Sequence, residues 1–125
     1  MIKRINLSGS TNPQSNDTYS PCVMAGDFIF TSHQGGNQDS NDAAVQLEGS
    51  LLSLERTLEA AGATLDDVVQ LNLLLKNADD FRGTKPVFER FFKSGYPART
   101  TYITDFVAPH ILVQVDAIAY KKATD

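Results

Sequence analysis

The sequence has little of several residue types that mark particular classes of protein. It contains one cysteine and no tryptophan among 125 residues, and its two histidines are His33 and His110. A single Cys22 cannot form an internal disulfide, so we expect a reducing compartment and a cytoplasmic protein. Neither histidine has a Cys or carboxylate at ligand spacing, which argues against a metal site. No apolar run approaches the length of a membrane span, and the polar residues after Ile2–Asn6 predict no signal peptide.

Positive charge is also scarce. Lysine and arginine total 11 against 15 acidic residues, which gives a formal net charge of −4 and an isoelectric point near 5.0. This balance argues against the basic surface that nucleic acids and anionic membranes require, so neither is expected as a partner. The hydrophobic share is 42%, and at this length roughly two thirds of the unfolded surface can be buried. Residues 1–125 are therefore expected to form a single domain.

Patterns in the first part of the chain predict strands. Apolar and polar residues alternate from Ile2 to Leu7, as in a half-buried strand, and the polar stretch Ser8–Ser20 is typical of a loop. Two apolar runs, Pro21–Met24 and Phe28–Thr31, flank the turn residues Ala25-Gly26-Asp27 and predict a hairpin.

The clearest periodic signal predicts a long amphipathic helix after this hairpin. Ser40 or Asn41 can cap its start, and Gly62 supplies the residue that ends it. Its apolar stripe consists of Leu47, Leu51, Leu54, Leu58 and Ala61. Such a stripe covers a sheet and suggests no chemistry.

The second half of the chain predicts a strand, a helix and two more strands. The strand Val69–Leu75 has one face of alternating apolar residues, and a helix is predicted to start at Thr84 with Pro86 in its first turn. The strands Arg99–Phe106 and Ile111–Lys121 follow. The order hairpin, helix, strand, helix, strand, strand predicts an α+β fold, one sheet with two helices on one face. The other face is expected to be too apolar for water, which favours oligomerisation.

Arg99 is the first candidate for a functional side chain. It begins a strand soon after Gly95 and Pro97 end a helix, and no carboxylate is nearer in the sequence than Asp105. A guanidinium at a strand end offers a planar fork of donors that matches a carboxylate or phosphate. The same position also suits an ordinary surface arginine.

Further polar and aromatic residues are open to two interpretations. His33 and Gln34 precede two glycines, so they could line a site or lie solvated in a loop. Phe81 falls outside the apolar stripe of the second helix and could line a cleft or pack in the core. Gln114 and Asp116 interrupt an apolar strand, which either a function or exposure on a half-wet sheet would explain.

Six motifs of the sequence occur in the order and spacing of a known family. They are Thr31-Ser32-His33-Gln34, Leu58-Glu59-Ala60-Ala61-Gly62, Asp66-Asp67-Val68-Val69, Asp79-Asp80-Phe81, Tyr96-Pro97-Ala98-Arg99-Thr100 and Val115-Asp116-Ala117-Ile118-Ala119. Over residues 20–121 the chain thus resembles the RidA/YjgF family of enamine/imine deaminases. The resemblance implies a chorismate-mutase-like α+β fold and a homotrimer with sites in the clefts between subunits. It also implies hydrolysis of 2-imino acids, made by pyridoxal-phosphate enzymes, to 2-keto acids and ammonia without metal or cofactor.

The resemblance assigns roles to particular residues. Arg99 lies where the family binds the substrate carboxylate, Ser32 at its pocket serine and Phe81 at an aromatic residue near the pocket. Gln114 lies where the family has the Glu thought to position the hydrolytic water. A neutral amide can orient a water but cannot take its proton. Arg99 and Gln114 are the expected catalytic residues.

Other family positions are also changed in this chain. Cys22 lies where active members usually have a Tyr, and His33 replaces the Gly after the pocket serine. Thr101 replaces the Cys two residues after the arginine, and Lys85 replaces an Asn early in the second helix. The expected substrate contacts are Cys22, Ser32, His33, Phe81 and Thr101.

The sequence is compatible with three functions. The first is a divergent deaminase in which Arg99 holds the carboxylate, Gln114 holds the water and His33 is available as a proton carrier. The second is a paralogue that binds a small carboxylate without catalysis, which the changes at Gln114 and Cys22 favour. The third is RNA cleavage or translation inhibition, a label that some family members carry, and the acidic balance fits it least.

Overall fold

The structure is a computed structural model that describes residues 1–7 and 18–122. Most of the predicted loop Ser8–Ser20 therefore lies outside the described residues. The strands are β1 (Ile2–Ile5), β2 (Cys22–Ala25), β3 (Phe28–Thr31), β4 (Val68–Leu75), β5 (Ala98–Ile103) and β6 (Val113–Tyr120). The helices are α1 (Ala43–Ala60) and α2 (Lys85–Phe91), with the 3-10 turns η1 (Leu65–Asp67), η2 (Ala78–Asp80) and η3 (Arg82–Thr84).

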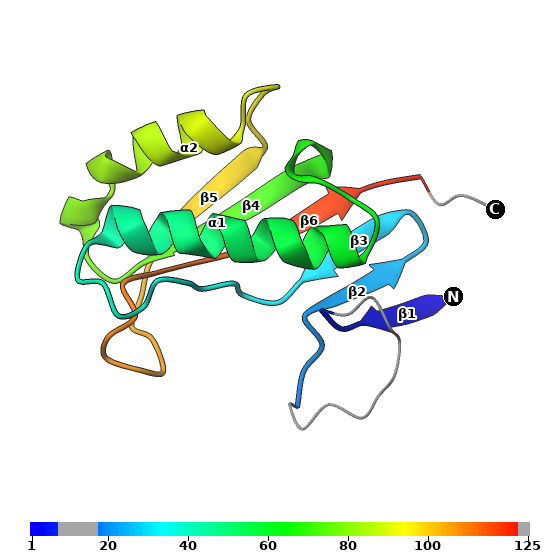
Figure 1. The fold of residues 1–125 in the computed structure, drawn as a ribbon, viewed down its shortest axis with the longest axis horizontal. Coiled ribbons are helices and arrows are strands. Elements are labelled where there is room, and N and C mark those ends of the chain that lie inside the picture. Colours follow the sequence, from blue (N-terminus) through cyan, green and yellow to red (C-terminus); the bar gives the residue numbers. More distant parts are fainter. Residues whose placement is uncertain (8–17, 123–125) are drawn as a thin grey trace.

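The six strands form one sheet in the order β1-β2-β3-β6-β4-β5, and both helices lie on the same face (Figure 1). This arrangement confirms the predicted α+β fold. All strand pairs are antiparallel except β4 with β5. Parallel neighbours need a crossover connection, and here η2, η3 and α2 make the crossover. The crossover segment consequently lies against the start of β5.

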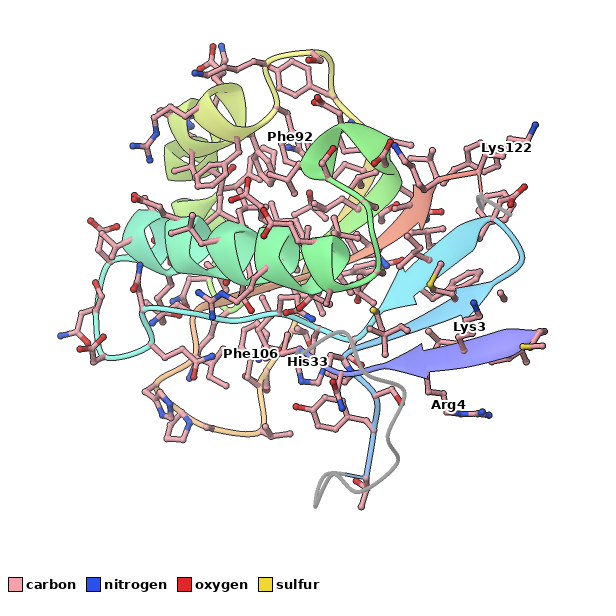
Figure 2. All side chains as sticks on the ribbon, turned by 45° about the vertical axis from the view of Figure 1, so that its right-hand side comes forward. Lys3, Arg4, His33, Phe92, Phe106 and Lys122 are labelled. Carbon is pink, nitrogen blue, oxygen red and sulfur yellow. The ribbon has the colours of Figure 1, made fainter. Side chains whose placement is uncertain are left out.

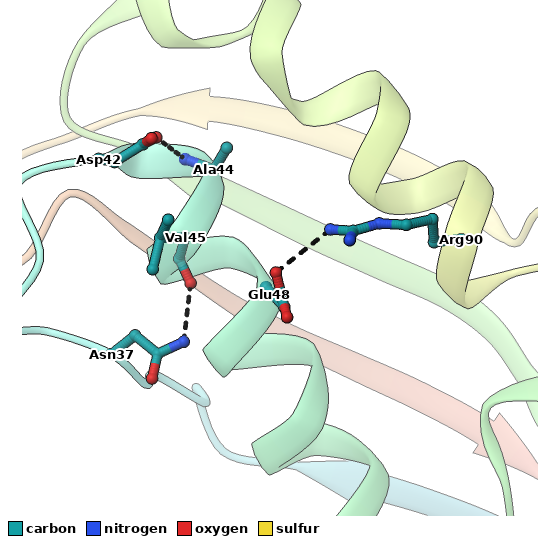
Figure 3. Close-up of polar contacts among 6 residues, drawn as sticks. All are labelled: Asn37, Asp42, Ala44, Val45, Glu48 and Arg90. Atoms are coloured by element: carbon teal, nitrogen blue, oxygen red, sulfur yellow. Dashed lines mark hydrogen bonds and ion pairs between the residues drawn. The ribbon is translucent and has the colours of Figure 1, made fainter.

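The start of α1 differs from the prediction. Asp42 is the N-cap, and its carboxylate accepts the backbone N–H of Ala44 at 2.9 Å (Figure 3). The hydroxyl of Ser40 instead accepts the N–H of Asp42 at 3.1 Å. The cap was therefore wrongly placed at Ser40 or Asn41, because the sequence offers three consecutive capping residues and only the chain path selects among them.

The end of α1 and its apolar stripe agree with the prediction. Gly62 has φ +85°, and the N–H groups of Gly62 and Ala63 donate to the carbonyls of Glu59 and Leu58. This is the hydrogen-bond pattern of a Schellman motif, which favours glycine at the left-handed position. Four leucines of α1 are fully buried against the sheet: Leu47, Leu51, Leu54 and Leu58. Glu48 of α1 pairs with Arg90 of α2 at 3.2 Å (Figure 3).

The later strands are shorter or less regular than predicted. β5 ends at Ile103 and β6 covers Val113–Tyr120. In β4 the register shifts between Val68 and Gln70, so that Val69 is the extra residue of a bulge. Val69 is therefore 47% exposed and Val68 is buried in its place. The prediction of Val69 in the buried row was wrong because a bulge reverses the alternation of side chains at that point.

The face of the sheet opposite the helices carries aromatic side chains. Phe28, Phe30, Tyr102 and Tyr120 lie on it and are between 43% and 51% exposed. The rings of Phe28 and Tyr120 meet edge to face, with centroids 5.3 Å apart. We call this the open face. Its apolar character agrees with the expectation from the sequence, and oligomerisation through it stays a prediction.

Candidate carboxylate-binding site

The turn before β5 places Arg99 on the helix-covered face of the sheet. Gly95 adopts φ +133°, a conformation suited to glycine, and the chain then enters β5 at Ala98. In the parallel ladder Arg99 pairs with Leu71 of β4. Leu71 is completely buried beneath the helices, and paired residues share a face of the sheet. The side chain of Arg99 therefore lies on the side of α2.

Two aromatic rings hold the guanidinium of Arg99. Its Cζ lies 5.4 Å from the ring centroid of Phe81 and 5.1 Å from that of Phe88. Among residues 1–7 and 18–122 the ion pair found is Arg90 with Glu48, so no carboxylate neutralises Arg99 there. A guanidinium over aromatic faces keeps the N–H groups along its edge available for an anion. This arrangement prepares a cation for an external carboxylate.

A cavity of about 680 Å³ lies beside this guanidinium. Its apolar walls are Leu71, Phe81, Phe88, Tyr96 and Pro97. Its polar and charged residues are Arg82, Thr84, Lys85, Glu89 and Arg99. Mostly apolar walls with a few polar groups are typical of a small-molecule site, and such sites span about 300–1,000 Å³.

The turn before α2 fixes Phe81 at the rim of the cavity. Phe81 is 41% exposed, and its carbonyl accepts both the hydroxyl of Thr84 at 2.6 Å and the backbone N–H of Thr84 at 3.1 Å. Thr84 is buried, so its two hydrogen bonds tie the turn to the core. Of the two interpretations of Phe81, the structure supports the cleft.

Gln114 lies on the opposite face of the sheet from Arg99. It pairs with Leu74 of β4, three residues after Leu71, and side chains alternate between the faces of a strand. Gln114 is half-buried on the open face, where its amide nitrogen lies near Gly35. The two expected catalytic residues therefore do not meet within one chain.

The segment after β3 belongs to the same region as Gln114. Gln34 forms an isolated bridge with Val115, and its buried side chain accepts hydrogen bonds from Ser53 and Thr57 of α1. These contacts make Gln34 a structural residue that joins α1 to β6.

Ser32 and His33 lie in this region, away from the Arg99 cavity. Ser32 is half-buried and donates its hydroxyl to the carbonyl of Ser20. His33 is exposed, with its ring 6.2 Å from that of Tyr19. Figure 2 shows His33 well separated from Phe92 at the end of α2. The predicted site residues thus fall into two groups, Arg99 with Phe81, and Ser32 and His33 with Gln114.

The structure does not support a substrate contact at Cys22. Its side chain is 1% exposed within the core, and its thiol donates to the carbonyl of Thr57 at 3.9 Å. Burial raises the pKa of this thiol to about 11. In β2 the side chain of Cys22 lies on the same face as that of Met24, which points to α1. Its role is packing.

Thr101 shares the face of Arg99 but does not line the cavity. It pairs with the buried Leu73 and is itself half-buried. Several lining residues were missed as site residues, among them Arg82, Tyr96 and Phe88. Phe88 was missed because its contact with Arg99 depends on how the crossover packs.

Within residues 1–7 and 18–122, no group of three His, Cys, Asp or Glu side chains could hold a metal ion. No helix in that same part is both long and apolar enough to cross a membrane.

The fold and the cavity together define a class of protein, a single-sheet α+β domain with a small-molecule cavity between β5 and its crossover. The family model described as Endoribonuclease L-PSP matches residues 9–121. The chain is 30% identical over 116 residues to a RutC family protein of Pyrococcus horikoshii, covering 88% of this chain and 92% of the relative. It is also 30% identical over 122 residues to a protein of Dermatophagoides farinae named 2-iminobutanoate/2-iminopropanoate deaminase, covering 93% and 94%.

A solved structure gives the same result. A hypothetical protein of Streptococcus pyogenes M1 GAS, described as a member of the yjgF family, superposes with a TM-score of 0.84. Its sequence is 31% identical, and the match covers 98% of each chain. The chain therefore belongs to the Endoribonuclease L-PSP family, the RidA/YjgF group that the motifs indicated.

Proposed function

We propose that this protein hydrolyses 2-imino or enamino acids to 2-keto acids and ammonia, as a cofactor-independent deaminase. One observation carries the proposal: the Arg99 guanidinium lines an apolar cavity, held by Phe81 and Phe88 without a carboxylate partner. A 2-imino acid carries its reacting carbon directly beside a carboxylate, so a fork on the carboxylate also orients the imine. Relatives named as 2-iminobutanoate/2-iminopropanoate deaminases support the reaction class.

Hydrolysis of an imine depends mainly on a correctly positioned water molecule. Water adds to the imine carbon while the nitrogen gains a proton, and the resulting carbinolamine loses ammonia to leave the keto acid. Gln114 orients the water through its amide, and His33 is the nearby group able to carry a proton. Holding the reactants in place supplies much of the acceleration when the intrinsic barrier is low.

The two groups of site residues require a second subunit in this scheme. Arg99 and Gln114 lie on opposite faces of one sheet, so a small substrate cannot touch both in the same chain. A cleft between neighbouring subunits of a homotrimer joins Arg99 of one copy with Ser32, His33 and Gln114 of another. The apolar open face supports this assembly because it is left uncovered in a single chain.

A coupled assay tests the proposed activity. The protein is mixed with freshly generated 2-iminobutanoate, and formation of the 2-keto acid is followed for wild type, Arg99→Ala and Arg56→Ala. Arg56 is exposed on α1 and does not line the cavity, so its variant removes the same charge elsewhere. We expect Arg99→Ala to lower kcat/KM about tenfold to a hundredfold, the loss of a charge-assisted contact, and Arg56→Ala to leave it unchanged. Equal activity of all three proteins would refute the site.

A protein that binds small carboxylates without catalysis is the second candidate. The observation that favours it is Gln114, because an amide cannot deprotonate water. In that case the wild type binds 2-oxobutanoate in calorimetry through Arg99, and the imine disappears no faster than in buffer.

A further inference from the structure

The cavity beside Arg99 carries more positive charge than a single carboxylate needs. Arg82 and Lys85 line it together with Arg99, and Glu89 is the acidic residue of the lining. The lining is thus positive by two charges, three cations against one carboxylate, in a chain whose formal net charge is −4. A local excess of this sign attracts and holds anions.

The three cations approach the cavity from different parts of the chain. Arg82 comes from η3, Lys85 is the first residue of α2, and Arg99 is the second residue of β5. In the part of the chain that the structure describes, the ion pair found joins Arg90 to Glu48, so none of these three is neutralised by an acid. Glu89 lies one helical turn after Lys85 and forms no ion pair with it there. A monoanion bound to Arg99 leaves Arg82 and Lys85 without a partner.

We infer that the substrate of this site is a dianion, a 2-imino acid whose side chain carries a second carboxylate. The inference rests on the proposed function of the same site and names its substrate class. The carboxylate next to the imine binds Arg99, and the side-chain carboxylate binds Arg82 and Lys85. The accessible apolar walls at Phe81 and Tyr96 contact the methylene groups between the two carboxylates.

The size of the cavity agrees with a longer substrate. A cavity of about 680 Å³ has room for an acid longer than four carbons. An apolar side chain would fill the same space, but it would make no ion pair with the two exposed cations of the lining. Charge therefore distinguishes the two ligand classes, and shape does not.

Calorimetry with two product-like acids tests the inference on the full chain. 2-Oxoglutarate and 2-oxobutanoate are titrated at equal ionic strength, because salt screens exposed charges. Each exposed ion pair contributes up to about fivefold in binding, so we expect 2-oxoglutarate to bind about five- to twentyfold more tightly. A third acid, 5-methyl-2-oxohexanoate, has an isopropyl group of similar size in place of the second carboxylate and should bind more weakly than 2-oxoglutarate.

Variants assign the preference to the two cations. Arg82→Ala/Lys85→Ala should bring the two dissociation constants within about twofold, chiefly by weakening 2-oxoglutarate. Lys93→Ala removes an exposed lysine that does not line this cavity and should keep the preference. Equal binding of 2-oxoglutarate and 2-oxobutanoate by the wild type overturns the inference. So does a preference that survives in the double variant, or binding of 5-methyl-2-oxohexanoate as tight as that of 2-oxoglutarate.

These measurements separate the inference from the proposed reaction, because binding requires no turnover. A protein that prefers 2-oxoglutarate through Arg82 and Lys85 but hydrolyses no imine supports the dianion site and refutes the deaminase. A protein that hydrolyses 2-iminobutanoate but binds both keto acids equally refutes the dianion site and supports the deaminase.

Discussion

Arginine and lysine differ most where a cation lies against aromatic rings and faces a planar anion, as Arg99 does. Lysine keeps the charge but loses the fork that matches two carboxylate oxygens. We expect Arg99→Lys to raise the dissociation constant of 2-oxobutanoate about tenfold, the value of one charge-assisted hydrogen bond. The free energy of unfolding should change by less than about 0.5 kcal/mol, because Arg99 is exposed. Calorimetry and urea unfolding check both values, and unchanged binding would mean that a point charge suffices.

Substitution of Gln114 tests whether catalysis by this chain needs a carboxylate base. A well-placed general base contributes about a hundredfold or more, so we expect Gln114→Glu to raise kcat for 2-iminobutanoate by that order. KM should rise as well, because a second carboxylate in an assembled site competes for Arg99 or repels the substrate. Separate values of kcat and KM test this. An active wild type with no change in either value would show that positioning, or His33, replaces the family's base, and His33→Ala should then be slow.

The buried thiol of Cys22 makes stability depend on pH in the alkaline range. Burial raises its pKa in the folded protein to about 11 from 9.0. The thiol form is therefore stabilising below pH 9, and stability is lost as the pH rises through 11, because the unfolded chain releases the proton first. The loss is up to about 2–3 kcal/mol, at about 1.4 kcal/mol per pH unit.

Urea unfolding of wild type and Cys22→Ala between pH 8 and 11 isolates this contribution. Tyrosines and lysines titrate in both proteins, so the difference between the two curves belongs to Cys22. We expect the wild type to lose its advantage over the variant as the pH rises. Parallel curves would mean that the thiol is solvated in the folded protein.

At the level of the elements, α1 and the preceding loop touch backbone to backbone. A Cβ at Gly49 would lie 2.6 Å from the carbonyl carbon of Gly36, closer than real contacts. We expect Gly49→Ala to lower the free energy of unfolding by about 1–3 kcal/mol through overpacking, although alanine favours a helix by about 1 kcal/mol. Gly83→Ala is the matched control, because its Cβ would meet nothing within 4 Å. Chemical denaturation measures both, and a stabilised Gly49→Ala would contradict the contact.

Local features of the elements could be predicted from the sequence, and features that depend on contacts between distant segments could not. The stripe of α1 was predicted because it repeats over several turns, and the stop at Gly62 because it depends on local backbone conformation. The bulge at Val69 was not, since it arises from pairing between β4 and β6, which lie far apart in the sequence. The strands predicted for β5 and β6 likewise extended several residues beyond the strands of the structure.

The residues of the site also differ in how far the sequence could predict them. Arg99 could be singled out from its isolation among small residues at a strand start, and the structure adds the cavity that makes it useful. Phe81 was placed near the pocket by the resemblance, but the ring of Phe88 could not be assigned to Arg99, because the crossover between β4 and β5 brings it there. Cys22 was misjudged for a related reason: only the packing of β2 against α1 shows that its side chain is enclosed in the core.

At the scale of the whole molecule, the helix-covered face and the open face of the sheet differ in burial and in the residues they carry. The covered face contains the core and the Arg99 cavity. The open face exposes Phe30 and its aromatic neighbours beside Gln114. Aromatic residues at this density are typical of surfaces that bind another protein. We therefore expect subunits to associate through the open face and to complete the site where they meet.

Sedimentation equilibrium tests this association. At micromolar concentration we expect the wild type to have three times the 13.7 kDa mass of one chain. Phe30→Asp places a charge in the centre of the open face, where desolvation in an interface is costly, so we expect a monomer that retains its circular dichroism. Val45→Asp is the control: it is the same type of change at a residue 38% exposed on α1, away from the open face, and should stay trimeric.

We expect variants that lose the trimer to lose activity as well, because Arg99 and Gln114 lie on opposite faces of the sheet and cannot meet within one chain. Phe30→Asp should therefore lose kcat with 2-iminobutanoate even though it changes no residue of the Arg99 cavity. Mixing Arg99→Ala with Gln114→Ala subunits provides a second check, since a mixed trimer contains some clefts with both residues intact and should recover part of the activity. A wild type that is monomeric at micromolar concentration and fully active would place the whole reaction in one chain, and the cleft between subunits would have no part in it.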